Sequence, residues 1–125
     1  MQTIVKWSFV LGLMFMLLAA CSSTAPTPVD PAVLDATLTT DPDNPIAGTK
    51  VRLKAAFTGA ELSNSSGMTF EIRVNEKPIL IEAIKEDNNT FEGGYTFVES
   101  GTYEVYLHLY TEDIHLTKKK QVVVQ

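Results

Sequence analysis

The sequence contains a single cysteine, Cys21, so no disulfide within the chain can stabilise the fold. Basic residues are few: ten Lys and Arg stand against fifteen Asp and Glu, without an arginine-rich or aromatic-interleaved basic stripe. This balance argues against nucleic acid as a partner. The sequence has no nucleophile-elbow or phosphate-loop pattern, and its only histidines are His108 and His115. We therefore expect a protein that is not an enzyme and depends on its hydrophobic core for stability.

No stretch shows a helical period of apolar residues with caps. Instead, short runs alternate apolar and polar residues, which predicts β-strands separated by turns. These runs span residues 32–40, 48–58, 68–75, 79–85, 91–98, 103–110 and 114–124. About seven short strands predict an all-β fold, an antiparallel β-sandwich of immunoglobulin-like type. The alternation places Met68 in the core, both faces of 79–85 are apolar, and Gly93-Gly94 predicts a β-bulge.

The N-terminal segment has the features of a signal peptide. Lys6 is its only basic residue, and it precedes an apolar run over 7–20 that is too short for a comfortable membrane span. The run ends Leu18-Ala19-Ala20-Cys21, which resembles a bacterial lipobox, whose cysteine is lipidated and becomes the first mature residue. A thiol consumed by lipid also explains a lone cysteine in a secreted protein. The alternatives are an ordinary secretory signal or an uncleaved anchor.

The expected organisation is a signal peptide over 1–20, the lipidated cysteine with a flexible tether over 21–31, and the sandwich over 32–125. The segment after Cys21 is rich in Pro, Ser and Thr and lacks the apolar groups that would offset the entropy of ordering. Removal of residues 1–20 removes one basic residue and no acid, which leaves a net charge of about −6. We therefore expect a protein on the extracytoplasmic face of the cell membrane, held there by the lipid on Cys21.

The only basic cluster is Lys118-Lys119-Lys120. We interpret it as a solvated strand edge that is protected from pairing with other chains, because lysines on an edge discourage strand addition. Contact with anionic lipid headgroups is the alternative.

The terminal hairpin, over 101–124, holds both histidines. If Tyr110 faces His115 across the turn, His108 faces Thr117; with a longer loop, His108 faces His115 directly. Either register places the two histidines on the same face, roughly 5 to 8 Å apart. A shift by one residue would place them on opposite faces. Two imidazoles alone leave a zinc or copper site incomplete, and half-exposed strand residues are the alternative interpretation.

Short motifs along residues 36–124 resemble the YtkA-like domain, a family of small, mostly Gram-positive lipoproteins and membrane-anchored proteins with an immunoglobulin-like sandwich. They are Phe70-Glu71-Ile72, Ile81-Glu82-Ala83, Gly94-Tyr95, Gly101-Thr102-Tyr103, Leu107-His108-Leu109, Ile114-His115-Leu116 and Val122-Val123-Val124. In the family, the terminal hairpin carries one histidine and then a Met-His-x-Met-Pro run.

The resemblance implies copper handling outside the cell. His108 and His115 match the two family histidines, whereas Ile114, Thr117 and Lys118 replace Met, Met and Pro. The loss of both thioethers implies harder and weaker metal binding. The sequence thus supports two functions. The first is a lipid-anchored binding protein that contacts another protein through exposed strand faces and end loops such as 58–67. The second is a copper-binding or copper-delivery lipoprotein that uses His108 and His115.

Overall fold

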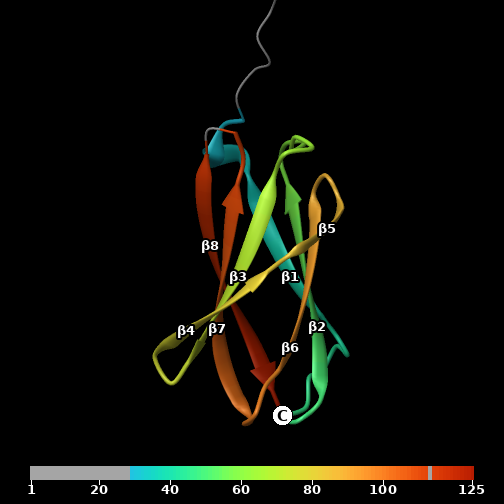
Figure 1. Cartoon of the computed structure of the whole chain (residues 1–125), viewed down its shortest axis with the longest axis vertical. Coiled ribbons are helices and arrows are strands. Elements are labelled where there is room, and N and C mark those ends of the chain that lie inside the picture. The colour runs from blue at the N-terminus through green and yellow to red at the C-terminus, as the bar shows by residue number, and fades with distance from the viewer. Residues whose placement is uncertain (1–28, 113) are drawn as a thin grey trace, which may run out of the picture.

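Two antiparallel sheets of four strands each pack face to face (Figure 1). The computed structural model describes residues 29–112 and 114–125, so the predicted signal peptide and Cys21 lie outside the described residues. Sheet A has the strand order β1-β2-β6-β5, and sheet B has the order β4-β3-β7-β8. The strands are β1 (Asp35–Asp41), β2 (Lys50–Thr58), β3 (Gly67–Val74), β4 (Lys77–Glu82), β5 (Ile84–Asp87), β6 (Thr90–Thr96), β7 (Gly101–Tyr110) and β8 (His115–Val124).

This order confirms the predicted β-sandwich. Relabelled in the immunoglobulin convention, sheet A reads A-B-E-D and sheet B reads C′-C-F-G, which is the constant-type arrangement with one added strand. Tyr103 adds a further immunoglobulin feature, because its hydroxyl donates to the Glu99 carbonyl at 2.6 Å. Tyr103 lies near the start of β7, two residues before the buried Val105, which is the position of the tyrosine corner in immunoglobulin domains.

The core forms where the inward faces of the two sheets meet. Strand β2 follows its predicted alternation: Val51, Leu53, Ala55 and Phe57 are buried, and the residues between them are exposed or half-buried. Met68 is buried as predicted. Burial of such apolar surface contributes roughly 1.5 to 3 kcal/mol per large side chain and drives the two sheets together.

The segment 79–85, predicted as one strand, is two strands in different sheets. β4 pairs with β3 in sheet B, and β5 pairs with β6 in sheet A. The chain crosses between the sheets at Ala83, whose N–H donates to the Met68 carbonyl at 2.9 Å. The alternation continues through the crossing: Ile79 and Ile81 face the core and are half-buried, whereas Leu80 and Ile84 point outward and are 65% and 75% exposed. Both sides of the segment are apolar because Leu80 lies on the outer face of sheet B and Ile84 on the outer face of sheet A. The division into two strands raises the number of strands to eight in the described part.

The prediction of a β-bulge at Gly93-Gly94 is wrong. The β2–β6 ladder runs without a shift through both glycines, opposite Leu53 and Arg52, and the irregularity lies instead in β5, between Lys85 and Asp87. Gly93 has a packing role, because a Cβ there would lie 3.0 Å from the Phe70 ring. Gly93 therefore leaves room for the Phe70 ring of sheet B, and it forms no bulge in sheet A.

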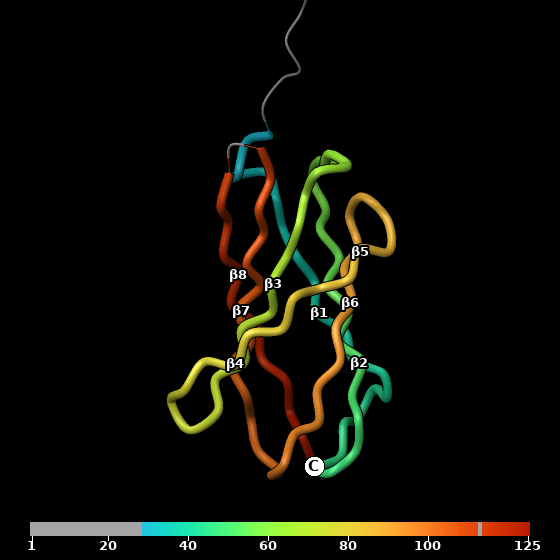
Figure 2. The backbone as a smooth tube through the Cα atoms, in the orientation of Figure 1, coloured from blue at the N-terminus to red at the C-terminus, as the bar shows by residue number. Residues whose placement is uncertain are grey.

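The packed part of the chain begins slightly before the predicted boundary at 32. Val29 packs against the core, and a one-turn 3-10 helix, η1 (Pro31–Val33), follows Asp30, whose side chain accepts from the Ala32 N–H. The N-terminal side of the domain lies at the end that holds the β7–β8 turn, opposite the C-terminus (Figure 2). Within the described ranges, no helix is long and apolar enough to span a membrane.

Candidate functional site

The terminal hairpin adopts the first of the two predicted same-face registers. Tyr110 pairs with His115, and His108 pairs with Thr117. The turn is closed by the Thr111 N–H, which donates to the Ile114 carbonyl at 2.9 Å. Both histidines lie on the outer face of sheet B, with ring centroids 5.7 Å apart and ring planes at 48°. The prediction that they lie side by side is therefore confirmed.

The histidines belong to a larger group of outward side chains, which we call the histidine face. It comprises Glu71 and Arg73 of β3, Glu104, Tyr106, His108 and Tyr110 of β7, and His115, Thr117 and Lys119 of β8. The Tyr110 ring stacks on His115 at 4.4 Å, and Tyr106 lies nearly parallel to His108 at 6.5 Å. The Arg73 guanidinium carbon lies 5.4 Å from the Tyr106 ring centroid, a cation–π contact.

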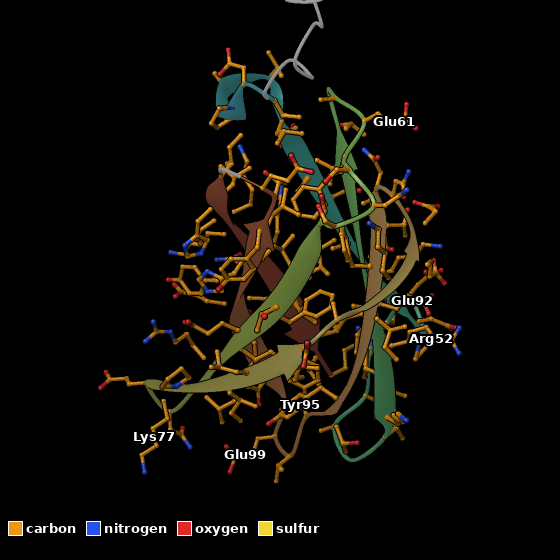
Figure 3. All side chains as sticks on the ribbon, turned by 45° about the horizontal axis from the view of Figure 1, so that its top comes forward. Arg52, Glu61, Lys77, Glu92, Tyr95 and Glu99 are labelled. Carbon is orange, nitrogen blue, oxygen red and sulfur yellow. The ribbon has the colours of Figure 1, made fainter. Side chains whose placement is uncertain are left out.

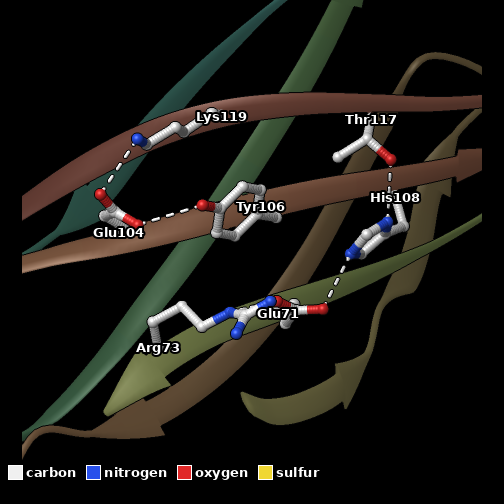
Figure 4. A network of polar contacts seen from close by, with 7 residues as sticks. All are labelled: Glu71, Arg73, Glu104, Tyr106, His108, Thr117 and Lys119. Carbon is white, nitrogen blue, oxygen red and sulfur yellow. Dashed lines mark hydrogen bonds and ion pairs between the residues drawn. The ribbon is translucent and has the colours of Figure 1, made fainter. Parts of the chain in front are cut away.

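His108 is held through both ring nitrogens (Figure 4). Its Nε2 lies 3.2 Å from Glu71 Oε1, and its Nδ1 lies 3.0 Å from Thr117 Oγ1. An ionised carboxylate only accepts, so Nε2–H donates to Glu71, and in the neutral ring the Thr117 hydroxyl donates to Nδ1. The other Glu71 oxygen accepts from Arg73 Nε at 2.6 Å. These contacts fix His108 between strands that are far apart in the sequence.

A second chain of contacts lies beside the first on the same face. Lys119 Nζ lies 3.0 Å from Glu104 Oε1, and the Tyr106 hydroxyl donates to Glu104 Oε2 at 3.0 Å. The Lys119 ammonium, and after it the Tyr106 hydroxyl, lowers the pKa of Glu104 below its usual value. Glu104 in turn raises the pKa of Lys119. The pair is solvent-exposed, so its effect is local and depends on salt.

The predicted basic cluster divides between the two sides of β8. Lys119 points outward into the histidine face, whereas Lys118 and Lys120 alternate to the opposite side and are half-buried. β8 is one of the two edge strands of sheet B. Inward-pointing lysines on an edge strand hinder pairing with another chain, which favours the edge-protection interpretation.

The row Thr117–His108–Glu71 has the hydroxyl–imidazole–carboxylate order of a nucleophile, base and orienting acid. It lies on an open sheet face, and the depressions at Gly94 and between β1 and β8 are lined by other residues. In the part of the chain that the structure describes, no three His, Cys, Asp or Glu side chains gather in a group that could hold a metal. The histidine face thus presents aromatic and imidazole rings together with hydrogen-bonding groups that are fixed in place.

The end loop 58–67, which the sequence predicts as a contact region, is bound by the side chains of Asn89 and Lys85. Asn89 donates to the carbonyls of Phe57 and Ala60 at 2.9 and 2.7 Å. Its Oδ1 accepts from the N–H of Leu62, which is buried. Lys85 Nζ donates to the Ser63 carbonyl at 2.9 Å and to the Asn64 carbonyl at 3.0 Å. The loop is therefore ordered against the end of the sandwich.

Sequence reasoning identified the two histidines but missed their partners. The alternation of 68–75 already places Glu71 and Arg73 on the outer side of their strand. Local patterns do not show which strand lies next to β7, and the contact with Glu71 depends on that choice. Asn89 and Lys85 were missed for the same reason, because their partners are more than twenty residues away in the sequence.

No protein-family model matches the chain, and no curated protein matches it in sequence. Among solved structures, the crystal structure of an engineered protein matches it with a TM-score of 0.57 at 13% sequence identity. The match covers 77% of this chain and 21% of that chain, so this chain spans about a fifth of the length of the engineered protein. At that identity the likeness concerns the fold alone. The chain is thus a two-sheet antiparallel β-sandwich with a distant structural match.

Proposed function

We propose that this protein is a lipid-anchored extracytoplasmic binding protein whose histidine face contacts a protein partner. One observation carries the proposal: four rings, those of Tyr106, His108, Tyr110 and His115, lie together on one outer face. The outward positions of sheet A in the described residues hold no aromatic side chain. Tyrosine and arginine are enriched at the centres of protein interfaces, so this asymmetry favours sheet B as the contact side.

The fixed geometry of the face also supports binding. Hydrogen bonds hold His108, Glu71 and Thr117 in place before any partner arrives, so association costs less side-chain entropy than on a mobile surface. The charges are already paired, Arg73 with Glu71 and Lys119 with Glu104, so a partner that covers them leaves no isolated charge.

The rim of the face offers an apolar contact and free polar groups. Leu80 pairs with Glu71 in the β3–β4 ladder and is 65% exposed. Tyr110 and His115 are exposed as well. The expected partner is therefore a protein surface that covers Leu80 and supplies hydrogen-bonding groups to Tyr110 and His115.

The membrane anchor rests on the sequence Leu18-Ala19-Ala20-Cys21 and on the resemblance to the YtkA-like lipoproteins. Mass spectrometry of the protein from membranes tests it: we expect Cys21 as the N-terminal residue, carrying lipid. A Cys21→Ser variant should lose the lipid and leave the membrane fraction or remain unprocessed. Intact Met1 with an unmodified Cys21 would contradict the anchor without affecting the proposal about the histidine face.

Site-specific photocrosslinking in cells tests the contact face. A photoreactive amino acid replaces Tyr110 on the histidine face or, as the matched control, Thr37 on an outward position of sheet A at the end of β1 away from Asp41. We expect a discrete crosslinked partner from position 110 and none from position 37. Equal crosslinking from both positions, or from position 37 alone, would overturn the proposal.

Copper binding is a second candidate, favoured by one specific observation. A histidine that binds a metal usually donates its other ring N–H to a carboxylate, and Glu71 holds that position beside His108 Nε2. His108 Nδ1 would then be the metal ligand, with Thr117 turned away, and His115 would supply a second nitrogen. The resemblance to the YtkA-like domain also favours copper, although Ile114 and Thr117 stand where that family has thioethers.

Copper titration with and without His115→Ala separates the two functions. A copper site requires the variant to bind more weakly than the original chain, and a Glu71→Gln change to weaken binding less, since it removes only the orienting carboxylate. Equal copper affinity of the His115→Ala variant and the original chain would eliminate copper and leave the protein-binding function.

A further inference from the structure

The outer face of sheet A holds a column of three cations that the histidine face does not explain. Lys50, Arg52 and Lys54 occupy successive outward positions of β2, a central strand. Lys54 Nζ lies 3.2 Å from Glu86 Oε2. In the described ranges, neither Lys50 nor Arg52 forms an ion pair. Asp41 lies opposite Arg52 in the β1–β2 ladder and Glu92 is near enough to feel its charge, but neither acid lies within ion-pair distance of Lys50 or Arg52.

A depression of about 510 Å³ opens beside these two cations. It is lined by Asp41, Pro42, Lys50, Arg52, Ile84, Glu92, Gly93 and Gly94. Gly94 lies opposite Arg52 in the β2–β6 ladder and leaves the outer face open. A Cβ at position 94 would lie 2.9 Å from Lys50 Cε, so the lysine stem crosses the space that this glycine leaves. Figure 3 shows Arg52 and Glu92 together on this side of the molecule.

We propose that this depression binds a carboxylate of an acidic peptide segment. Arg52 and Lys50 supply charge-assisted donors, and the planar guanidinium matches a carboxylate in a two-point contact. Asp41 and Glu92 line the same depression and accept the backbone N–H groups on either side of that carboxylate. Ile84, 75% exposed, and Pro42 offer apolar contact to its side chains.

The two acids in the wall favour a peptide over a phosphate. A phosphate group brings acceptors and about two negative charges but no amide donors, so it offers nothing to Asp41 and Glu92 and is repelled by them more strongly than a single carboxylate is. A peptide brings donors and acceptors together and satisfies both the cations and the acids. The depression lies on sheet A and the histidine face on sheet B. The peptide-binding proposal can therefore be tested independently of the proposed function.

The test is an NMR titration of the full chain in detergent micelles with the capped pentapeptide Gly-Glu-Gly-Glu-Gly. We expect the amide signals of Lys50, Arg52 and Gly94 to shift most, and the Gln counterpart of the peptide to leave them unchanged. Arg52→Gln should weaken binding about tenfold, as is typical for the loss of a charged hydrogen-bonding group. The double variant Lys50→Gln/Arg52→Gln should abolish binding.

Gly94→Ala distinguishes a shaped site from general charge attraction. It keeps every charge, and its Cβ meets only the far end of the flexible Lys50 side chain, so the fold should persist while the depression is partly filled. We expect it to weaken binding, whereas Lys77→Gln, at the tip of the β3–β4 hairpin, should not (Figure 3). Unchanged binding by Gly94→Ala or by the double variant, or tighter binding of inorganic phosphate than of the peptide, would overturn the proposal.

Discussion

The two outer faces of the sandwich differ in whether their charged and polar side chains are paired. The histidine face joins three strands through side-chain contacts: Glu71 of β3 reaches His108 of β7, which reaches Thr117 of β8. The outer face of sheet A is dominated by one strand, whose cations Lys50 and Arg52 form no ion pair in the described residues. The first face is thus fixed internally, and the second leaves charge available. Substitutions on the first face should therefore change stability as well as partner contact, whereas substitutions of Lys50 and Arg52 on the second should change only peptide binding.

The largest effect on stability is expected from Glu71→Ala. The Glu71 side chain is only 14% exposed and accepts from both Arg73 and His108, so its loss leaves two donors without their acceptor. We expect the free energy of unfolding to fall by about 1 to 2 kcal/mol. Urea denaturation measures it. The matched change on sheet A, Glu86→Ala, removes an exposed ion pair with Lys54 and also the repulsion of Glu92, so the two effects offset and the midpoint should stay nearly unchanged. Equal losses in the two variants would remove the distinction between the faces.

Thr117→Val is a smaller change on the same face. It keeps the shape and β-branching of the side chain but removes the hydroxyl that bonds to His108 Nδ1. We expect a loss of about 0.5 to 1 kcal/mol by urea denaturation. The control is Thr39→Val, on an outward position of sheet A. Valine has a high strand propensity, so this change should be neutral or slightly stabilising. A Thr117→Val variant as stable as the original chain would mean that the hydroxyl does not hold His108.

Glu92→Gln should act with the opposite sign on sheet A. The hydrogen bond shared with Glu86 raises the pKa of Glu92, so in mildly acidic solution the folded chain retains a proton that the unfolded chain has already released. At pH 7 both acids are ionised and repel, and Gln removes this repulsion and can donate to Glu86. We expect the melting temperature to rise by about 1 °C at pH 7. The gain should shrink as pH falls toward 4.5, the usual pKa of Glu, because the original Glu92 then becomes protonated. A gain that persists in acid would contradict the shared proton.

Lys119→Gln gives the smallest effect and the clearest pH signature on the histidine face. The pKa of Glu104 is lowered by Lys119, and the pKa of Lys119 is raised by Glu104. The contribution of the pair is therefore present between the ordinary pKa of Glu, 4.5, and that of Lys, 10.5. It is lost in acid as Glu104 protonates and in alkali as Lys119 deprotonates. Melting curves should show a small deficit of the variant at pH 7 that disappears at both ends. A constant deficit at all pH values would assign the effect to packing.

The sequence predicts much of this fold because period-two alternation reports directly which side of a strand is buried. β2 is the clearest example, since all its inward residues are apolar and most of its outward residues are charged. The alternation does not reveal the crossing at 79–85: Ile79, Ile81 and Lys85 all lie on the inward side, yet the chain changes sheets at Ala83. The sequence pattern cannot show that change of sheet, because the inward and outward positions alternate in the same way on both sides of the crossing.

The register of the β7–β8 hairpin is also ambiguous in the sequence. Lys118 and Lys120 occupy inward positions of β8, so charge interrupts the apolar side of the strand. The alternation alone then favours neither face, and the packing of Leu116 and Val122 under β7 decides the outcome. The contacts of His108 with Glu71 depend further on β3 lying beside β7, which only the tertiary arrangement fixes.

Chemical footprinting of His115 tests the central claim most directly. Diethyl pyrocarbonate modifies exposed imidazoles, and His115 is exposed on the histidine face. The measurement compares the rate of His115 modification in native membranes with the rate in the purified, detergent-solubilised protein. If a partner covers this face, His115 in membranes should react several-fold more slowly. Equal rates in membranes and in detergent would show that the histidine face is uncovered and would contradict its role as the contact surface.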